Sequence, residues 1–141
     1  MGASNAELVD VYTKQVRSIL EQAVAVWSPS LTLNQSSQIE RVQKTFCAVV
    51  LGPKYNDYSI ALSALDLLTL DERRKTLCSN FAKKCVRSPK YQNWFVPKSV
   101  DPDNIQTRSD KTDFVPVNTR TKRYRKSPLP YLTEHLNMCK K

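Results

Sequence analysis

The chain has 141 residues, about the length of one domain, and its 22 basic and 13 acidic residues give a formal net charge of +9. Two glycines exclude a glycine-rich phosphate loop, and a single histidine limits histidine-based metal or nucleophile sites. Without a run of about 18 apolar residues or an apolar segment near Met1, we expect neither a membrane span nor a secretory signal. The charge favours a polyanionic partner, such as nucleic acid or an acidic membrane surface, in an intracellular protein, nuclear or cytoplasmic.

The charge and the prolines concentrate in the second part of the chain. Residues 1–87 carry a net charge of +3, whereas residues 88–141 carry +6 and six of the eight prolines. Leu, Ile, Val and Phe number 25 in the first part and 10 in the second, a fraction too low to bury a core easily. We therefore expect a folded head at residues 5–87 and a largely extended or disordered basic tail at residues 88–141.

The first expected helix covers residues 8–27. Its apolar residues recur at spacings of three and four, which predicts one continuous buried stripe. The stripe comprises Leu8, Val11, Tyr12, Val16, Ile19, Leu20, Ala23, Val26 and Trp27. Ser4 or Asn5 can cap its start, and Pro29 ends it because the residue before a proline disfavours helical angles.

The second expected helix begins near Thr32 and ends at Gly52-Pro53, where glycine supplies a left-handed residue and proline blocks continuation. Its expected buried face contains apolar residues on one side of the helix. They are Ile39, Val42, Phe46, Cys47, Val49 and Val50.

Two further helices complete the expected head. Ser59 is the expected cap of a short one, and Thr69 with Glu72 fits the capping box of a long one that ends near Arg87. The inward residues of this last helix are expected to be Leu77, Cys78, Phe81 and Cys85. The fold class is therefore mainly α, a small bundle of three long helices and one short helix.

The titratable residues give no convincing catalytic or metal site, and we expect no cofactor. Cys47, Cys78 and Cys85 fall on apolar faces and are expected to be small buried hydrophobes. His135 and Cys139 suit two ligands on a helical turn, but zinc normally takes four. The paired carboxylates lie in polar segments and are interpreted as solvated loop charges. They are Asp101, Asp103, Asp110 and Asp113.

The densest basic run lies in the tail, where five of seven residues are basic and a tyrosine lies among them. The run comprises Arg120, Thr121, Lys122, Arg123, Tyr124, Arg125 and Lys126. Basic side chains neutralise phosphates, and an aromatic ring can stack on an unpaired base. The same pattern is typical of a nuclear import signal and of a solvated loop without a partner, so three interpretations stay open.

Several segments together resemble the region after the polymerase core of non-LTR (LINE-like) retrotransposon reverse transcriptases. The first has the form Y-x3-[IV]-R-x-[IV]-L-E-x-A-x-x-V-W followed by L-T. Its matching positions are Tyr12, Val16, Arg17, Ile19, Leu20, Glu21, Ala23, Val26, Trp27, Leu31 and Thr32. The second block, IERVQKTFCAVVLG, runs from Ile39 to Gly52 and is followed by Tyr55 and Tyr58.

Two more blocks follow in the family's order. An L-x-x-L-x-x-R-R-x-x-L-C-x-x-F pattern matches Leu67, Leu70, Arg73, Arg74, Leu77, Cys78 and Phe81. The closing segment resembles the end of such polyproteins at Tyr124, Ser127, Pro128, Pro130, Tyr131, Leu132, Leu136 and Asn137. The resemblance therefore covers nearly the whole chain, from about Leu8 to Asn137.

The resemblance implies a thumb and post-polymerase piece that grips a template–primer duplex. The family holds magnesium with an aspartate pair, and this chain contains no Asp-Asp dipeptide, so we expect no polymerase activity. By the same resemblance, the arginines of these helices either contact nucleic acid or brace the fold. They are Arg17, Arg41, Arg73 and Arg74, of which Arg17, Arg73 and Arg74 are the predicted contacts.

The leading hypothesis is a non-catalytic fragment that binds RNA or DNA electrostatically and without sequence preference, and that does not bind membranes. One alternative is a helical interaction module that binds a protein partner or itself through an exposed apolar face. The other is a translated transposon remnant without a selected function.

Overall fold

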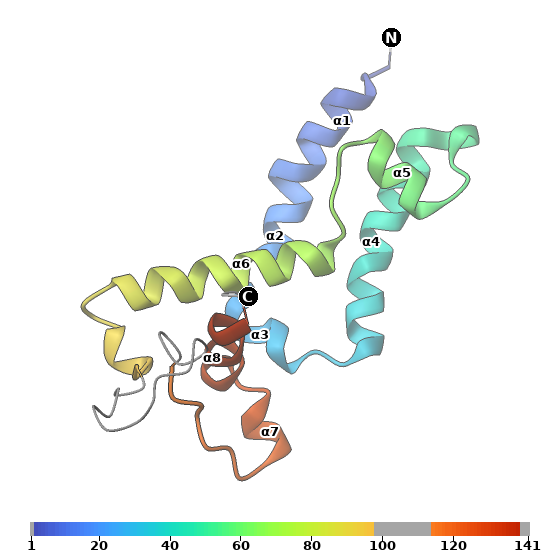
Figure 1. Ribbon diagram of the computed structural model, residues 1–141. Coiled ribbons are helices and arrows are strands. Elements are labelled where there is room, and N and C mark those ends of the chain that lie inside the picture. The colour runs from blue at the N-terminus through green and yellow to red at the C-terminus, as the bar shows by residue number, and fades with distance from the viewer. Residues whose placement is uncertain (1, 98–113, 139–141) are drawn as a thin grey trace. The chain divides into compact units, whose positions relative to one another are not determined.

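The computed structural model, drawn in Figure 1, describes residues 2–97 and 114–138 of a mainly helical chain. Within these ranges the β-type pairing is an isolated antiparallel bridge between Pro97 and Phe114. The described residues form two units, the first with residues 2–24 and 31–75, the second with residues 25–30, 76–97 and 114–138. The expected mainly α fold is confirmed, and the division between the units falls inside α6 (Leu70–Arg87).

The N-terminal segment is not the single helix expected over residues 8–27. α1 (Asn5–Val11) continues through a π-helical turn at Tyr12–Val16 into α2 (Arg17–Glu21). Ala23 then adopts a left-handed φ of 51°, and α3 (Val24–Trp27) follows this break. The start agrees with expectation, because Ser4 and Glu7 form a complete capping box.

The π turn explains why the expected apolar stripe is wrong. One extra residue in a helical turn rotates everything after it by about 100°. Tyr12, at the start of the turn, is only 2% exposed, whereas Ile19 is 71% exposed. Val16 and Val26 are exposed as well. Val11 is also exposed, but it precedes the turn, which therefore does not account for it.

α4 (Leu33–Leu51) has the boundaries that its sequence predicts. Thr32 caps it through a reciprocal pair of hydrogen bonds with Gln35, and Gly52 ends it with a φ of 53°. α5 (Tyr58–Ala64) differs from expectation, because Asp57 rather than Ser59 is its cap. The Asp57 carboxylate accepts a hydrogen bond from the Ser59 amide at 3.0 Å, which places Ser59 inside the helix.

α6 begins at the predicted capping box, in which Thr69 and Glu72 bond to each other's backbone amides at 3.2 and 3.3 Å. It ends at Arg87, as expected. Cys78 and Cys85 are buried on its inner face, but Phe81 is 42% exposed, contrary to expectation.

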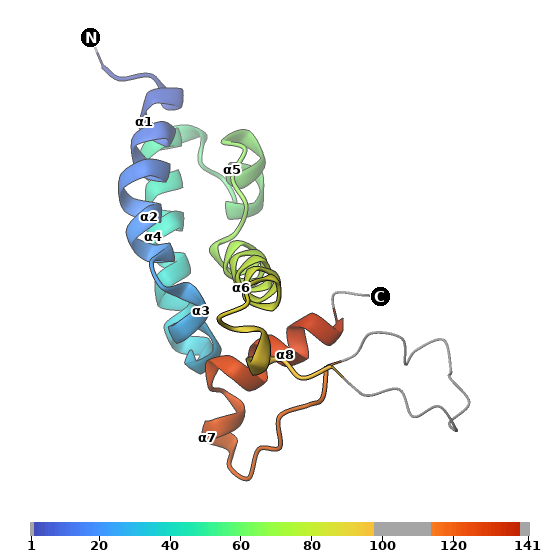
Figure 2. The ribbon, with the colours of Figure 1, turned by 90° about the vertical axis from the view of Figure 1, so that its left-hand side faces the viewer.

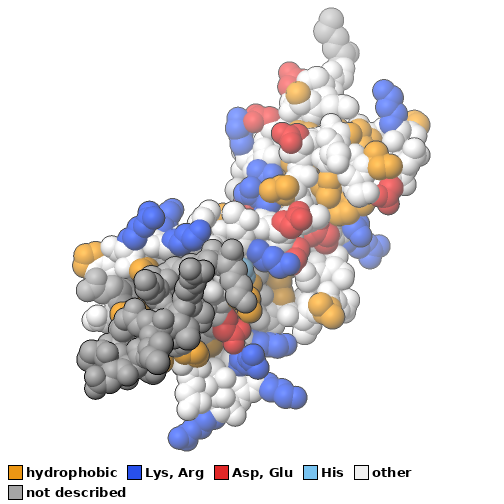
Figure 3. Space-filling model, in the orientation of Figure 1, with side chains coloured by type: hydrophobic (Ala, Val, Ile, Leu, Met, Phe, Trp, Pro, Cys, Tyr) orange, Lys and Arg blue, Asp and Glu red, His pale blue; other side chains and the backbone are white. Residues whose placement is uncertain are grey.

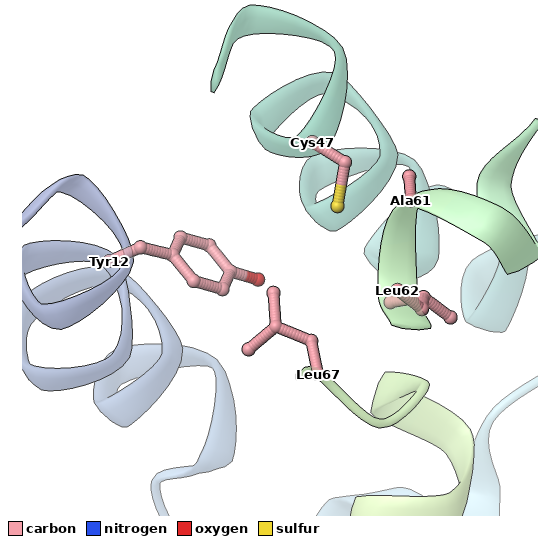
Figure 4. Close-up of a cluster of buried hydrophobic side chains, with 5 residues drawn as sticks. All are labelled: Tyr12, Cys47, Ala61, Leu62 and Leu67. Atoms are coloured by element: carbon pink, nitrogen blue, oxygen red, sulfur yellow. The ribbon is translucent and has the colours of Figure 1, made fainter. Parts of the chain in front are cut away.

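The core of the first unit gathers side chains from four segments (Figure 4). Tyr12 comes from the π turn, Cys47 from α4, Ala61 and Leu62 from α5, and Leu67 from the connection before α6. In Figures 1 and 2, α4 runs back along α1 and α2, and α5 folds over the end of α4.

The most buried residue of α4 beside Cys47 is polar, because Gln43 has 0% of its surface exposed. Its Oε1 accepts a hydrogen bond from the Tyr12 hydroxyl at 3.0 Å. Its Nε2 donates to the Tyr58 hydroxyl at 3.1 Å and to the Leu68 carbonyl at 2.8 Å. Burial raises the pKa of Tyr12 to about 12, so its hydroxyl stays a donor at neutral pH.

The expected buried face of α4 therefore needs correction at two positions. Val42 is 41% exposed and Val49 is 75% exposed, while Gln43 is buried and bonds to Tyr12 of the π turn and Tyr58 of α5. A fully hydrogen-bonded amide is tolerated in a core, and hydrophobic periodicity alone does not identify it.

The second unit contains helices within the expected tail. α7 (Lys122–Arg125) and α8 (Pro128–Met138) are helical, so the expectation of an extended tail does not hold there. Pro128 and Pro130 lie in the first turn of α8, where a missing amide costs no intrahelical hydrogen bond. The Asn137 side chain accepts from the Phe114 amide at 2.9 Å and donates to its carbonyl at 3.1 Å. The rest of the expected tail, residues 98–113 and 139–141, lies outside the described residues.

Replacing Gln43 tests whether its amide organises the first unit. Gln43→Met keeps the side-chain length but leaves the Tyr12 hydroxyl and the Leu68 carbonyl without their partner. We expect the free energy of unfolding to fall by about 2–3 kcal/mol, because each unsatisfied buried polar group costs roughly 1–3 kcal/mol. Urea unfolding followed by circular dichroism measures the change.

The matched control is Gln38→Met, which makes the same substitution at an exposed position of α4. Its effect should stay within about 0.5 kcal/mol. Equal stabilities of the two variants would contradict the role of Gln43.

Candidate nucleic-acid interface

Two of the predicted contact arginines, Arg17 and Arg73, lie against one carboxylate in the first unit. Arg73 donates two hydrogen bonds to Glu21, from Nε to Oε1 and from Nη2 to Oε2, the latter at 2.8 Å. Arg17 Nε lies 3.6 Å from Glu21 Oε1. These three side chains are between 15% and 28% exposed, and the hydrogen bonds that Arg73 donates to Glu21 raise the pKa of Arg73 above its ordinary value.

The third predicted arginine, Arg74, is buried, with 3% of its surface exposed. Its Nη2 donates to Ser36 Oγ at 2.7 Å and to Asp71 Oδ1 at 3.2 Å. Lys75 also approaches Asp71, at 2.6 Å, and its hydrogen bond is the largest cause of the lowered pKa of that carboxyl. All three arginines thus contact groups of the first unit itself.

The basic run at Arg120–Lys126 lies in the second unit. Thr121 begins α7 by accepting a hydrogen bond from the Tyr124 amide at 3.1 Å. The Ser30 hydroxyl donates to the Lys126 carbonyl at 3.2 Å, so the backbone is held at both ends of this short helix. All seven residues of the run are exposed. Figure 3 shows basic side chains projecting around the position of α7, at the lower end of the view.

The cations of this run are mostly unneutralised. Arg125 Nε lies 3.4 Å from Glu134 Oε1, with both side chains largely exposed. The other four basic residues make no ion pair with any residue that the structure describes. They are Arg120, Lys122, Arg123 and Lys126. Exposed and unpaired cations on one short segment are suited to phosphate contacts.

A shallow hollow adjoins the basic run. It is lined by Asn118, Arg120, Thr121 and Tyr124. Tyr124 is 45% exposed there. The hollow thus brings together a guanidinium group, an amide and an aromatic ring, the three kinds of group that bind phosphates and bases.

The structure adds two residues that the sequence analysis missed, Asn118 and Glu134. No local pattern in the sequence identifies Glu134 as a partner of the run. Its position depends on α8 following α7 closely, with Lys126 and Ser127 between them.

The other candidate residues described by the structure are three cysteines and His135. The cysteines Cys47, Cys78 and Cys85 are buried, as expected, and burial raises the pKa of Cys47 and Cys85. His135 packs against the Tyr131 ring with centroids 5.0 Å apart.

Within residues 2–97 and 114–138, no group of three or more His, Cys, Asp or Glu side chains could hold a metal ion. None of the helices described there combines the length and the apolar character needed to cross a membrane. The remaining candidates, Asp101, Asp103, Asp110, Asp113 and Cys139, lie outside the described residues.

Comparisons of the chain with protein-family models, with curated proteins and with solved structures give no match. The resemblance to non-LTR retrotransposon reverse transcriptases therefore stays a prediction from the sequence motifs.

Replacing Arg73 tests the structural role of the arginines in the first unit. Arg73→Gln removes the paired hydrogen bonds to Glu21, and we expect a loss of about 1–2 kcal/mol in the free energy of unfolding. Nucleic-acid affinity, measured where the variant is folded, should change less than about twofold, because this arginine is already engaged. Arg87→Gln, at the exposed end of α6, is the control and should alter neither quantity appreciably. A large loss of affinity at unchanged stability would assign Arg73 to the interface instead.

Proposed function

We propose that the chain is a non-catalytic protein, related to a retrotransposon reverse transcriptase, that binds nucleic acid through the basic run Arg120–Lys126. The proposal rests on the exposed and largely unpaired positive charge of this run. It presents five exposed cations, and one described carboxylate, that of Glu134, neutralises one of them in part. The motif resemblance and the absence of an Asp-Asp dipeptide support the non-catalytic part of the proposal.

The expected mode is phosphate contact, which is independent of base sequence and sensitive to salt. Each neutralised phosphate releases condensed counterions, so the logarithm of the binding constant falls linearly with the logarithm of salt concentration. Five contacts on duplex DNA correspond to a slope of about −4.5, since each contributes roughly −0.9. A gel-shift titration with RNA and with DNA tests the proposal directly. No binding at about 50 mM salt, where phosphate contacts are strong, would end it.

Removing two cations of α7 should weaken binding by a defined amount. The double variant Lys122→Gln/Arg123→Gln is expected to flatten the salt slope on duplex DNA by about 1.8, twice the contribution of one contact. Binding constants measured at several salt concentrations give both slopes.

The matched control is Lys83→Gln/Lys84→Gln, which removes the same net charge from exposed positions of α6. If the basic run is the interface, this control keeps the original slope. An equal loss in both variants would show that net charge, rather than the run, drives binding.

Glu134 should act as an internal competitor of phosphate. Glu134→Gln removes the carboxylate 3.4 Å from Arg125 and frees this guanidinium for the ligand. We expect the affinity to rise by about two- to fivefold at low salt, because an exposed ion pair is worth less than about 1 kcal/mol. The gain should disappear in Glu134→Gln/Arg125→Gln. A gain that persists there would mean that Glu134 repels phosphate without acting on Arg125.

A second candidate function is self-association through α4. Val42 and Val49 are seven residues apart, hence on the same face of this helix, and both are exposed. Exposed apolar patches on helices pair with partners or with a second copy. Light scattering distinguishes the candidates, because a concentration-dependent dimer with weak nucleic-acid binding supports self-association.

A further inference from the structure

We propose that the hollow beside α7 is a single-strand site, in which Tyr124 stacks on an unpaired base while the flanking cations hold the phosphates. The inference rests on the proposed function and narrows its ligand to single-stranded RNA or DNA. It follows from the exposure and the contacts of one aromatic ring in the described structure, that of Tyr124.

Tyr124 differs from the other five tyrosines of the chain. The hydroxyls of Tyr12 and Tyr58 bond inside the first unit, and Tyr55 packs against its core. Tyr91 and Tyr131 lie against the rings of Trp94 and His135, with centroids 4.9 and 5.0 Å apart. The ring of Tyr124 has no aromatic or cation contact with any described residue and is 45% exposed.

The backbone of Tyr124 is nevertheless held in place. Its amide donates to Thr121 Oγ1 at 3.1 Å, and its carbonyl accepts from the Ser127 amide at 2.9 Å. An ordered backbone that presents an unused ring loses little conformational entropy when a ligand binds. The ring is thus available for a flat, apolar group to stack on it.

The surroundings of the ring fit a nucleotide. Arg120 lines the same hollow as Tyr124, and Arg123 precedes the tyrosine in α7. Both of these cations precede the ring in sequence, and Arg125 and Lys126 follow it, so phosphate contacts are available on either side. Asn118 lines the hollow with a side-chain amide that can both donate to and accept from a base edge.

This arrangement favours single strands over duplexes. In a duplex the faces of the bases are covered by their neighbours, so the ring can reach no base without unstacking it. In a single strand every base has an accessible face, and stacking on an aromatic ring stabilises binding without sequence preference. A duplex gains the phosphate contacts of the run but not the stacking.

Fluorescence anisotropy with labelled oligomers tests the proposal. Their length of about 12 nucleotides lies within the site sizes of single-strand binding proteins. The ligands are oligouridylate, oligothymidylate and a blunt DNA duplex of the same length, at about 50 mM salt. The wild-type chain should bind at least one single strand about tenfold more tightly than the duplex. The RNA and DNA arms show which sugar is preferred, and preference for either strand over the duplex supports the site.

Substitutions at the ring separate stacking from charge. Tyr124→Ala should lose about tenfold in single-strand affinity and leave duplex affinity unchanged, whereas Tyr124→Phe keeps the ring and should bind within about twofold of wild type. Trp94→Ala is the matched control, because Trp94 is 51% exposed in the same unit but lies away from the run in sequence. It should bind like the wild type.

Two outcomes separate the failure of this site from the failure of the proposed function. Equal affinity for single strand and duplex, unchanged in Tyr124→Ala, would overturn the stacking site and leave phosphate binding intact. Absence of binding to all three ligands would overturn both. Photocross-linking of the wild-type chain to a bromouracil-containing strand requires no variant. An adduct on Tyr124 supports the site, and adducts confined to other residues overturn it.

Discussion

The first unit depends on one buried amide. Gln43 bonds to Tyr12 before α2, to Tyr58 at the start of α5 and to the backbone of Leu68 before α6. The Tyr58 hydroxyl in turn donates a hydrogen bond to the Glu40 carboxylate, which also accepts one from the amide of Leu70 at 3.1 Å. An amide that satisfies several segments at once fixes their register, because any slip leaves buried polar groups without partners. The network therefore specifies how these segments pack against one another.

Carboxylates divide the basic residues into two groups. In the first unit, Glu21 engages Arg17 and Arg73, and Asp71 engages Arg74 and Lys75. Carboxylates of the same unit therefore form ion pairs with these four cations. In the second unit, Glu134 is the described carboxylate at the basic run, and it contacts Arg125. These four cations of the first unit are thus paired, whereas four of the five cations of the run are not, and the proposed interface lies at the run.

Local chemistry explains what could be predicted from the sequence. The cap at Ser4, one of two candidates, the cap at Thr69, the helix start near Thr32 and the stop at Gly52 depend on residues within one helical turn. The structure confirms each of them, and it adds that Thr32 is itself the cap. The π turn after α1, the burial of Gln43 and the approach of Glu134 to Arg125 depend on contacts distant in the sequence or on packing. Hydrophobic periodicity assigns a glutamine to the surface, so it does not predict the burial of Gln43. It also assumes an uninterrupted helix, so it predicts the wrong buried face after Tyr12. The basic run is recognised from its composition, whereas only the structure shows that four of its five cations make no ion pair with a described carboxylate.

Amide chemical-shift mapping tests the central claim most directly. The uniformly ¹⁵N-labelled chain is titrated with an unlabelled single strand at about 50 mM salt, where phosphate contacts are strong. The account predicts that the largest shifts cluster on residues 117–127, with the helices carrying Arg17, Arg73 and Arg74 nearly unchanged. Shifts centred on those three arginines, or no shifts at any residue, would contradict it.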